Sequence, residues 1–274
     1  MKKQTLGFIG AGNMASSLIG GLISDGYPAD NIFVSDVDTA KLKDLASRFG
    51  VHTFEDNKSL VERSQTVLLA VKPQILEQVA REIAGPVRQR GPLMISIAAG
   101  VRETALDHWL GGGASIVRCM PNTPALVKTG ATALHANDRA SAEHRSVAEA
   151  IVRAVGIAVW VEKEELLDLV TALSGSGPAY FFLFMEAMED AATEMGMDKA
   201  TARLLTQQTA LGAARIAIES EDGPAELRRR VTSPGGTTEK AIEVFERGSL
   251  RSLVLDAMKA ANARAAELSK QLGG

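Results

Sequence analysis

The chain has 274 residues, of which 46% are hydrophobic and 23% are charged. These values are ordinary for a protein of one or two domains with enough length for a substantial core. The net charge of −3 argues against nucleic acid as the main partner. The single cysteine, Cys119, excludes an intrachain disulfide and a cysteine-rich metal site. It also suits a reducing compartment, so we expect a cytoplasmic protein.

The uncharged run from Gln4 to Ser24 follows two lysines and imitates a signal peptide or a membrane span. The run is rich in glycine, however, and it carries the polar residues Asn13, Ser16 and Ser17. Such a composition is poor for an apolar segment. We therefore predict no membrane segment here.

The same run has the pattern of a strand, a glycine turn and a helix. Leu6 to Ile9 form the apolar strand. Gly10 makes the tight turn, Gly12 lets the backbone approach a pyrophosphate, and the small Ala15 allows close packing of helix on strand. The apolar residues that share one face of the helix are Met14, Leu18 and Leu22. This G-x-G-x-x-A pattern predicts a dinucleotide site, although alone it is a weak signal.

The sequence that follows strengthens this prediction. A second strand ends at the acidic residue Asp36, about where such folds read the adenosine ribose. Further strand–helix units follow in the segments QTVLLAVKP, GPLMISIAAG and ASIVRCMPNTP. Their strands are nearly continuous apolar runs, as in a parallel sheet covered on both faces. We predict an α/β fold with a doubly wound, Rossmann-type sheet in a dinucleotide-binding domain of residues 1–162.

Polar or small residues follow the strands of this sheet, where ligands bind in such folds. A simpler interpretation is that the prolines only stop strands, that Gly100 makes a turn and that Lys72 is a surface charge. Because such residues follow three separate strands, ligand binding is the favoured interpretation. The segments are Val71-Lys72-Pro73, Ala98-Ala99-Gly100 and Asn122-Thr123-Pro124.

From about Lys163 the apolar period becomes helical, which predicts an all-α domain of residues 163–274. A helix beginning near Pro178 is apolar all round in its first half, so it should be buried on every side. A second copy of the chain is the simplest cover, and we expect an obligate dimer. The arginines 228–230 lie among acidic residues and predict a paired, solvated face and no nucleic-acid site.

The segment from Arg230 to Phe245, RVTSPGGTTEKAIEVF, predicts an anion site. Gly235 and Gly236 permit a tight turn, and Thr237 and Thr238 lead into a helix. Free N–H groups at a helix start favour a carboxylate or a phosphate.

Metal and nucleophile chemistry is not indicated. The four histidines are scattered, with none at H-x-x-x-H spacing, so we predict no metal site and no catalytic triad. Cys119 follows an apolar strand and is expected to be buried. A nicotinamide-type cofactor and one anion site remain, which points to hydride transfer.

The motifs FIGAGNMA, AVKP, SIAAG, RCMPNTP, LSGSGPAY and VTSPGGTT, in this order, resemble those of pyrroline-5-carboxylate reductase. The resemblance covers essentially the whole chain. It implies reduction of the cyclic imine Δ1-pyrroline-5-carboxylate to L-proline with NADPH or NADH, the last step of proline biosynthesis. It also implies a homodimer or a ring of dimers.

The resemblance assigns roles to particular residues. The substrate carboxylate would bind Ser233, Gly235, Gly236 and Thr237, and Thr238 would hydrogen-bond the ring nitrogen as the catalytic residue. Glu221 is a weaker candidate for a second polar contact with the substrate. The residues assigned to the cofactor are Gly10, Gly12, Asn13, Met14, Ser35, Asp36, Asn57, Ala70, Val71, Lys72, Pro73, Ala98 and Asn122.

The choice between NADPH and NADH stays open at this point. Members of the family generally favour NADPH, but Asp36 would repel a 2′-phosphate if its side chain faces the ribose. Either Ser35 contacts the phosphate and Asp36 points away, or NADH is accepted comparably well. Asn57 matches a residue that contacts the adenosine ribose in relatives.

Two other functions compete with the reductase. β-Hydroxyacid dehydrogenases share the glycine motif but use a lysine in the helical domain, and the segment GSGPAYFFLFMEAMEDAA contains no lysine. A non-enzymatic dinucleotide sensor would need no substrate turn, so SPGGTT argues against it. Fold alone does not decide among these functions.

Overall fold

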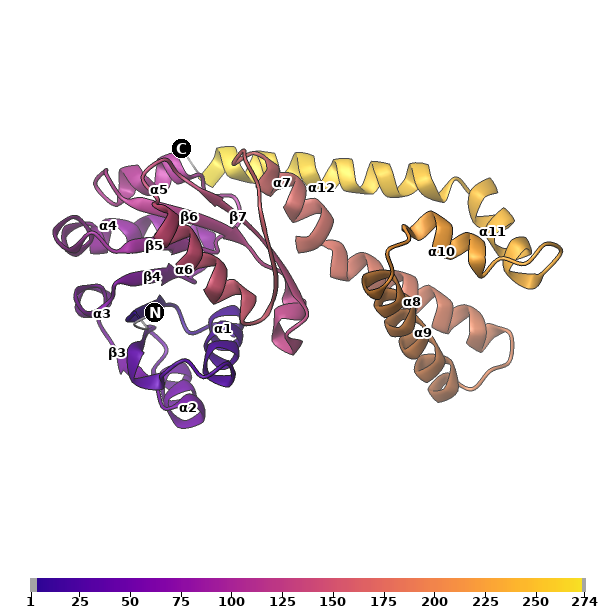
Figure 1. Cartoon of the computed structure of the whole chain (residues 1–274), viewed down its shortest axis with the longest axis horizontal. Helices are drawn as coiled ribbons and strands as arrows, with labels where there is room; N and C mark the ends of the chain where they lie inside the picture. The colour runs from indigo at the N-terminus through magenta and orange to yellow at the C-terminus, as the bar shows by residue number, and fades with distance from the viewer. Residues whose placement is uncertain (1–3, 273–274) are drawn as a thin grey trace. The chain divides into compact units, whose positions relative to one another are not determined.

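The structure, a computed structural model, describes residues 4–272. The chain forms two compact units. The first contains the residues up to Ser176 together with those from Ala261 onward, and the second contains Gly177–Ala260. Figure 1 shows the helices and strands of both units.

The first unit is built on one sheet in the order β3-β2-β1-β4-β5-β6-β7-β8. The strands are β1 (Leu6–Ile9), β2 (Ile32–Ser35), β3 (His52–Phe54), β4 (Thr66–Leu69), β5 (Leu93–Ser96), β6 (Ser115–Met120), β7 (Gly130–Ala136) and β8 (Gly156–Trp160). From β3 to β6 neighbouring strands are parallel. The crossover from β3 to β4 passes over β1 and β2, so the order reverses beside β1, which is where such sheets bind dinucleotides.

Helices cover both faces of this sheet. They are α1 (Asn13–Ser24), α2 (Thr39–Phe49), α3 (Asn57–Arg63), α4 (Pro73–Arg90), α5 (Glu103–Trp109) and α6 (Ala142–Arg153), with short 3-10 turns η1 (Ala29–Asn31) and η2 (Thr123–Val127). One buried apolar cluster joins α1, α2 and α6 to the strands. The other joins α3, α4 and α5 to the opposite face. The predicted doubly wound α/β fold is therefore confirmed.

The segment ASIVRCMPNTP does not form the expected strand–helix unit. β6 is followed by η2, and β7 then returns antiparallel to β6. An antiparallel partner needs only a short connection, whereas a parallel one needs a crossover of a dozen or more residues. The last two strands, β7 and β8, are parallel to each other and reversed relative to the other six.

The boundary between the units differs from the predicted one after residue 162. Helix α7 (Leu166–Val170) and the π-helical turn η3 (Thr171–Gly175) belong to the first unit, because Leu167 and Asp168 are buried there. The end of α12 (Leu250–Leu272) also belongs to it. Ser269 on α12 donates a hydrogen bond to Asp168 Oδ1 at 3.0 Å, and Leu272 packs against the buried cluster of α3, α4 and α5.

The second unit is entirely helical. It contains α8 (Gly177–Glu194), α9 (Lys199–Glu219), α10 (Pro224–Arg230), α11 (Thr237–Arg247) and the first part of α12. The predicted start near Pro178 is confirmed, and Gly196 follows the end of α8 with a left-handed φ of +101°. The ring centroids of Phe184 on α8 and Phe245 on α11 lie 5.9 Å apart, which joins these helices.

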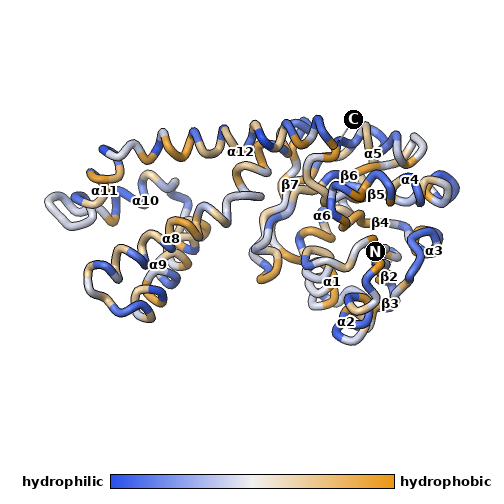
Figure 2. Tube along the Cα trace, turned by 180° about the vertical axis from the view of Figure 1, so that it is seen from behind, coloured by the Kyte–Doolittle hydropathy of each residue, from blue (hydrophilic) through white to orange (hydrophobic). Residues whose placement is uncertain are grey.

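Helix α8 is not buried within its own chain. Phe181, Phe182 and Leu183 are 68%, 64% and 66% exposed, and Figure 2 shows the apolar colour along this helix. The stretch Leu166–Glu194 is long and apolar enough, by composition, to cross a membrane. Large apolar side chains exposed along one helix indicate a contact with another molecule.

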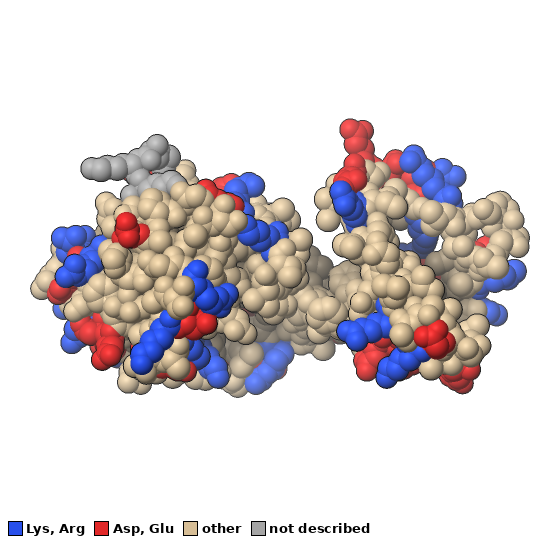
Figure 3. All heavy atoms as spheres, turned by 90° about the horizontal axis from the view of Figure 1, so that it is seen from below, with Lys and Arg blue, Asp and Glu red and all other residues tan. Residues whose placement is uncertain are grey.

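Charged side chains of both signs are mixed on the face seen in Figure 3. In α10, Arg229 and Arg230 pair with Glu226 and Arg230 also pairs with Asp222, while Arg228 pairs with Glu246 of α11. The predicted paired face of residues 228–230 is confirmed.

Candidate active site

The glycine turn after β1 is shaped for a phosphate. Gly10 has a φ of +106°, and a Cβ atom there would lie 2.6 Å from the Ala70 carbonyl oxygen, so only glycine fits. A Cβ atom on Gly12 would meet nothing within 4 Å, which leaves open space above the turn. No side chain caps α1. Among residues 4–272, the N–H groups of Gly12, Asn13 and Met14 have no hydrogen-bond acceptor.

These features fit a pyrophosphate. Unpaired N–H groups at a helix start donate to phosphate oxygens, and the positive end of the helix dipole favours negative charge. A glycine at position 12 lets the backbone approach the ligand without a side chain in between.

The predicted ribose-reading residue, Asp36, is held by backbone groups. Its Oδ2 accepts from the Ala11 N–H at 2.7 Å, and its Oδ1 accepts from the Asp38 N–H at 2.9 Å. The carboxylate therefore ties the glycine turn to the connection between β2 and α2, and its side-chain direction is fixed before any cofactor binds.

Ser35 and Asn57, two other residues assigned to the cofactor, contact each other. The Ser35 side chain is buried, and its hydroxyl donates to Asn57 Oδ1 at 2.7 Å. The Asn57 amide in turn donates to Glu82 Oε2 at 3.2 Å. The Ser35 hydroxyl is thus already engaged, which weakens the idea that it contacts a 2′-phosphate directly.

The other assigned strand-end residues lie at the same edge of the sheet. Ala70 donates its N–H to the Ile9 carbonyl at 2.8 Å, which places the end of β4 beside the glycine turn. Pro73 begins α4, Lys72 is the N-cap residue of this helix, and Val71 lies directly before it. Ala98 follows β5 and is 5% exposed. Asn122 follows β6. Its side-chain amide donates a hydrogen bond to the Ser174 carbonyl and accepts one from the Ala131 N–H.

A pocket of about 300 Å³ opens beside the glycine turn. Its lining includes Ala11, Gly12 and Ser16 on one side and Lys41 and Arg48 of α2 on the other. These two basic residues were not among the predicted cofactor residues. Their signal is the spacing of seven, two helical turns, which places both on one face of α2.

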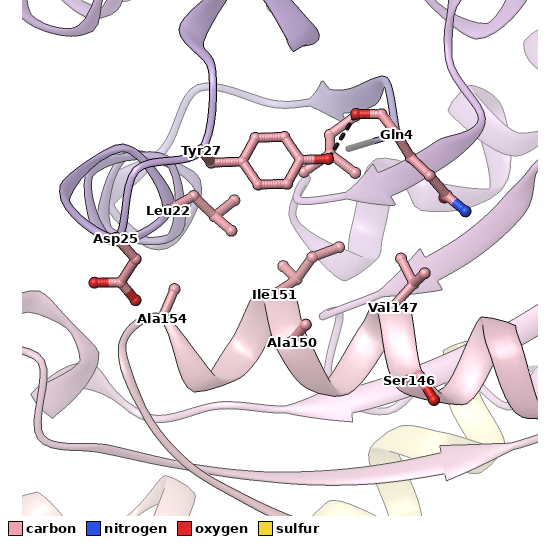
Figure 4. Close-up of a pocket in the computed structure, with 10 residues that line it drawn as sticks. Gln4, Leu22, Asp25, Tyr27, Ser146, Val147, Ala150, Ile151 and Ala154 are labelled. Carbon is pink, nitrogen blue, oxygen red and sulfur yellow. Dashed lines mark hydrogen bonds between the residues drawn. The ribbon is translucent and has the colours of Figure 1, made fainter. Parts of the chain in front are cut away.

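An apolar cavity of about 220 Å³ lies elsewhere (Figure 4). It is lined by Leu6 at the start of β1, Leu22 at the end of α1, and Val147 and Ile151 of α6. The Tyr27 hydroxyl donates to the Gln4 carbonyl at 2.6 Å at its edge. The cavity is at the amino end of β1, opposite the glycine turn, and the predicted cofactor residues do not line it.

In the second unit, the turn before α11 has the backbone features that an anion site requires. Gly235 has a φ of +71°, and no side chain caps the helix at Gly236. Within residues 4–272, the N–H groups of Thr237 and Thr238 have no hydrogen-bond acceptor, and the Ser233 hydroxyl has no hydrogen-bond partner. Thr238 is half-buried, whereas Ser233, Thr237 and Glu221 are exposed.

Glu239, which takes part in this turn, was not predicted from the sequence. The Glu239 carboxylate accepts the Gly235 N–H at 2.8 Å. A glutamate three residues after a helix cap commonly reaches back to the chain before the helix, so this spacing was a readable signal. Because Glu239 occupies the Gly235 N–H, that donor is not open to a ligand, whereas the N–H groups of Thr237 and Thr238 are.

The predicted burial of Cys119 is confirmed. Cys119 is 3% exposed, and burial raises the pKa of its thiol to about 12. Within residues 4–272, no group of three or more histidine, cysteine, aspartate or glutamate side chains could hold a metal ion.

Comparison with known proteins decides the family. Residues 164–268 match the family described as pyrroline-5-carboxylate reductase dimerisation, and residues 5–100 match NADP oxidoreductase, coenzyme F420-dependent. The chain is 49% identical over 273 residues to the pyrroline-5-carboxylate reductase of Pseudomonas aeruginosa, with 100% of both chains covered. The chain belongs to the pyrroline-5-carboxylate reductase family.

Solved structures of this family have the same fold. The pyrroline-5-carboxylate reductase of Coxiella burnetii is 46% identical, with a TM-score of 0.95 over 98% of this chain and 99% of that one. The pyrroline carboxylate reductase of Plasmodium falciparum, solved with NADP bound, is 28% identical, with a TM-score of 0.86 over 98% of this chain and 99% of that one. The resemblance predicted from the motifs is confirmed, and the dimerisation match agrees with the exposed apolar face of α8.

More distant likenesses show the fold alone. The 3-hydroxyisobutyrate dehydrogenase of Mycobacterium tuberculosis is 15% identical with a TM-score of 0.53. This protein stands for the β-hydroxyacid dehydrogenases considered above, and its likeness gives no support for that activity here.

Proposed function

We propose that this protein reduces Δ1-pyrroline-5-carboxylate to L-proline with NADPH or NADH, as the last step of proline biosynthesis. The observation that carries the proposal is the uncapped start of α11, with unpaired N–H groups on Thr237 and Thr238, in a member of this reductase family. The substrate carboxylate is the anion that such a site accepts.

The glycine turn and its surroundings would hold the cofactor. The N–H groups of Gly12, Asn13 and Met14 would bind the pyrophosphate, and the ends of β4 and β5 would border the rest of the dinucleotide. When bound, the reduced nicotinamide supplies the hydride. The protein's share of the work is to orient the imine carbon and to exclude competing reactions.

The substrate would be held by the turn before α11. The N–H groups of Thr237 and Thr238 and the Ser233 hydroxyl would bind the carboxylate, next to the backbone of Gly235 and Gly236. Holding the imine carbon in place can contribute several kcal/mol through proximity. A protonated imine is already electrophilic, so no catalytic histidine is needed.

Thr238 is the residue we assign to the ring nitrogen. Its hydroxyl can accept a hydrogen bond from the protonated imine and donate one to the amine that forms. It would therefore keep the nitrogen oriented through the reaction. Glu221 remains the weaker candidate for a second polar contact, because it is an exposed side chain of the α9–α10 connection.

The active form would be a homodimer or a ring of dimers. Support comes from the dimerisation match over residues 164–268 and from the exposed Phe181, Phe182 and Leu183 of α8. A Phe182→Asp variant should dissociate the dimer in light scattering. Val37→Asp is a matched control, because Val37 is 100% exposed in the first unit. A wild-type monomer, or a Phe182→Asp dimer, would contradict this assembly.

Product analysis tests the function. The protein, NADPH and racemic Δ1-pyrroline-5-carboxylate should give proline of the L form only, as resolved by chiral chromatography. Formation of no proline by a protein that still binds NADPH would contradict the proposal.

We also place the protein in the cytoplasm, supported by its single, buried cysteine.

A further inference from the structure

The unresolved choice between NADPH and NADH has a structural answer in the pocket beside the glycine turn. The two cofactors differ only by a phosphate on the adenosine ribose, so a residue that separates them must lie near that ribose. Rossmann-type sheets place this ribose at the carboxyl end of the second strand, which here is β2 and Asp36.

The residues first considered there are already committed to protein contacts. Both oxygens of Asp36 accept backbone N–H groups, from Ala11 and from Asp38. The buried Ser35 hydroxyl donates to Asn57. Neither side chain can supply the positive charge that a 2′-phosphate requires.

Lys41 does supply it. It lies in the first turn of α2, which begins at Thr39 directly after the connection from β2. Its side chain lines the same pocket as Ala11 and Gly12. The side chain is 52% exposed, and its Nζ lies 3.5 Å from Asp38 Oδ2, a separation typical of a weak surface pair. Lys41 is therefore free to exchange Asp38 for a phosphate.

Arg48, the other basic residue of this pocket, is less suited. Its guanidinium pairs with Asp44 at 2.9 Å and lies 4.7 Å from the centroid of the Phe49 ring. It is also seven residues further along α2, about 10 Å along the helix axis. That distance places it away from the end of β2.

We infer that Lys41 binds the 2′-phosphate of NADPH and sets the preference between NADPH and NADH. This inference rests on the proposed use of a nicotinamide dinucleotide but not on the identity of the imine. Asp38 opposes Lys41 in this role. Its side chain caps α2 by accepting hydrogen bonds from the N–H groups of Ala40 and Lys41. These hydrogen bonds, that from Lys41 foremost, hold the pKa of the Asp38 carboxyl below its usual range. Asp38 is therefore a competing anion for the lysine.

Calorimetric titration of the intact protein tests this assignment without turnover. The probes are adenosine 2′,5′-bisphosphate, which carries the ribose phosphate, and 5′-AMP, which lacks it. A Lys41→Met variant should bind the bisphosphate about tenfold more weakly, because one charge-assisted contact is lost, and 5′-AMP within about twofold of wild type. The loss should shrink as salt is added.

Two further variants sharpen the test. Lys43→Met removes an exposed lysine of the same helix that does not line the pocket, and it should leave both affinities unchanged. Asp38→Asn keeps a side chain able to cap α2 but removes the competing charge, so it should tighten bisphosphate binding by about threefold while 5′-AMP binding is unchanged.

An unchanged bisphosphate affinity in Lys41→Met would overturn the inference. An equal loss for both probes would also overturn it, since Lys41 would then support the turn and not read the phosphate. The same loss in Lys43→Met would show a general charge effect and would overturn it too. Neither probe contains nicotinamide or an imine, so these outcomes are independent of whether the protein makes proline.

Discussion

Asn122 bonds to Ser174 across the first unit. The Asn122 Nδ2 donates to the Ser174 carbonyl at 3.0 Å, and its Oδ1 accepts the Ala131 N–H at 2.9 Å. Ser174 lies in the π-helical turn η3, whose Gly175 would place a Cβ atom 2.7 Å from Met120 Cε. The segments RCMPNTP and LSGSGPAY are therefore joined by a side chain and by close packing. The Asn122 side chain therefore holds these two segments together, and its contact with the cofactor stays a prediction.

Substitution of Asn122 should separate these roles. Asn122→Ala leaves the Ala131 N–H and the Ser174 carbonyl without partners, which should lower the free energy of unfolding by about 1–3 kcal/mol. Urea denaturation measures this change. Asn122→Asp retains an acceptor for Ala131 but faces the Ser174 carbonyl with a second oxygen, and it should also be destabilising. If the variants keep wild-type stability but lose affinity for NADPH, Asn122 contacts the cofactor and does not mainly support the fold.

The two glycines of the turn should respond oppositely to alanine. Gly10→Ala forces a Cβ atom to 2.6 Å from the Ala70 carbonyl oxygen at a positive φ, so the protein should be strongly destabilised. Gly12 has a φ of −75° and open space around it, so Gly12→Ala should fold normally. Its methyl group stands where the pyrophosphate approaches, and the Kd for NADPH should rise by about tenfold or more.

Thermal unfolding and NADPH fluorescence titration measure these two effects. Normal NADPH affinity in Gly12→Ala would mean that the pyrophosphate does not approach the turn at this residue.

Replacement of Thr238 tests the proposed contact with the ring nitrogen. Thr238→Val keeps the shape of the side chain but removes the hydroxyl, and kcat should fall by about tenfold to a thousandfold. The Kd for NADPH should stay near the wild-type value, because the residue belongs to the substrate turn. Thr238→Ser, which keeps the hydroxyl, should retain much of the activity. Equal turnover of the Val variant and the wild type would remove Thr238 from the mechanism.

Cys119 should be unreactive in the folded protein. Its thiol is 3% exposed and burial raises its pKa to about 12, so at about pH 8 only about one part in ten thousand is thiolate. Because burial raises the pKa, the thiolate stays the minor form until the pH reaches that value. A thiol reagent should modify the native protein far more slowly than the urea-unfolded protein. Comparable rates would show that the β6 segment opens readily.

Much of the cofactor region could be predicted from sequence because its signals are local. The Gly10-Ala11-Gly12 turn, the apolar strand before it and the helix after it are adjacent in the chain, and each residue type has one physical reason. The strands ending near Lys72 and Ala98 could be placed in the same way, since parallel strands end at one edge of a sheet.

Contacts between distant segments could not be predicted in this way. The turn into the reversed strand β7 contains a hydrogen bond from the Ala131 N–H to Asn122, which no periodicity reveals. The return of α12 to the first unit depends on Ser269 meeting Asp168, 101 residues apart. The Asp36 carboxylate is oriented by the Ala11 N–H, a contact that the sequence does not reveal. Asp36 is therefore already engaged at the ribose site.

The most direct test of the central claim is the rate of NADPH oxidation by the purified protein. The account predicts rapid loss of NADPH absorbance that requires Δ1-pyrroline-5-carboxylate, with no reduction of NADP+ by an open-chain β-hydroxyacid. Reaction with the hydroxyacid alone would assign the turn before α11 to a different carboxylate. Tight NADPH binding with no turnover of either compound would contradict the reductase activity and support a dinucleotide sensor.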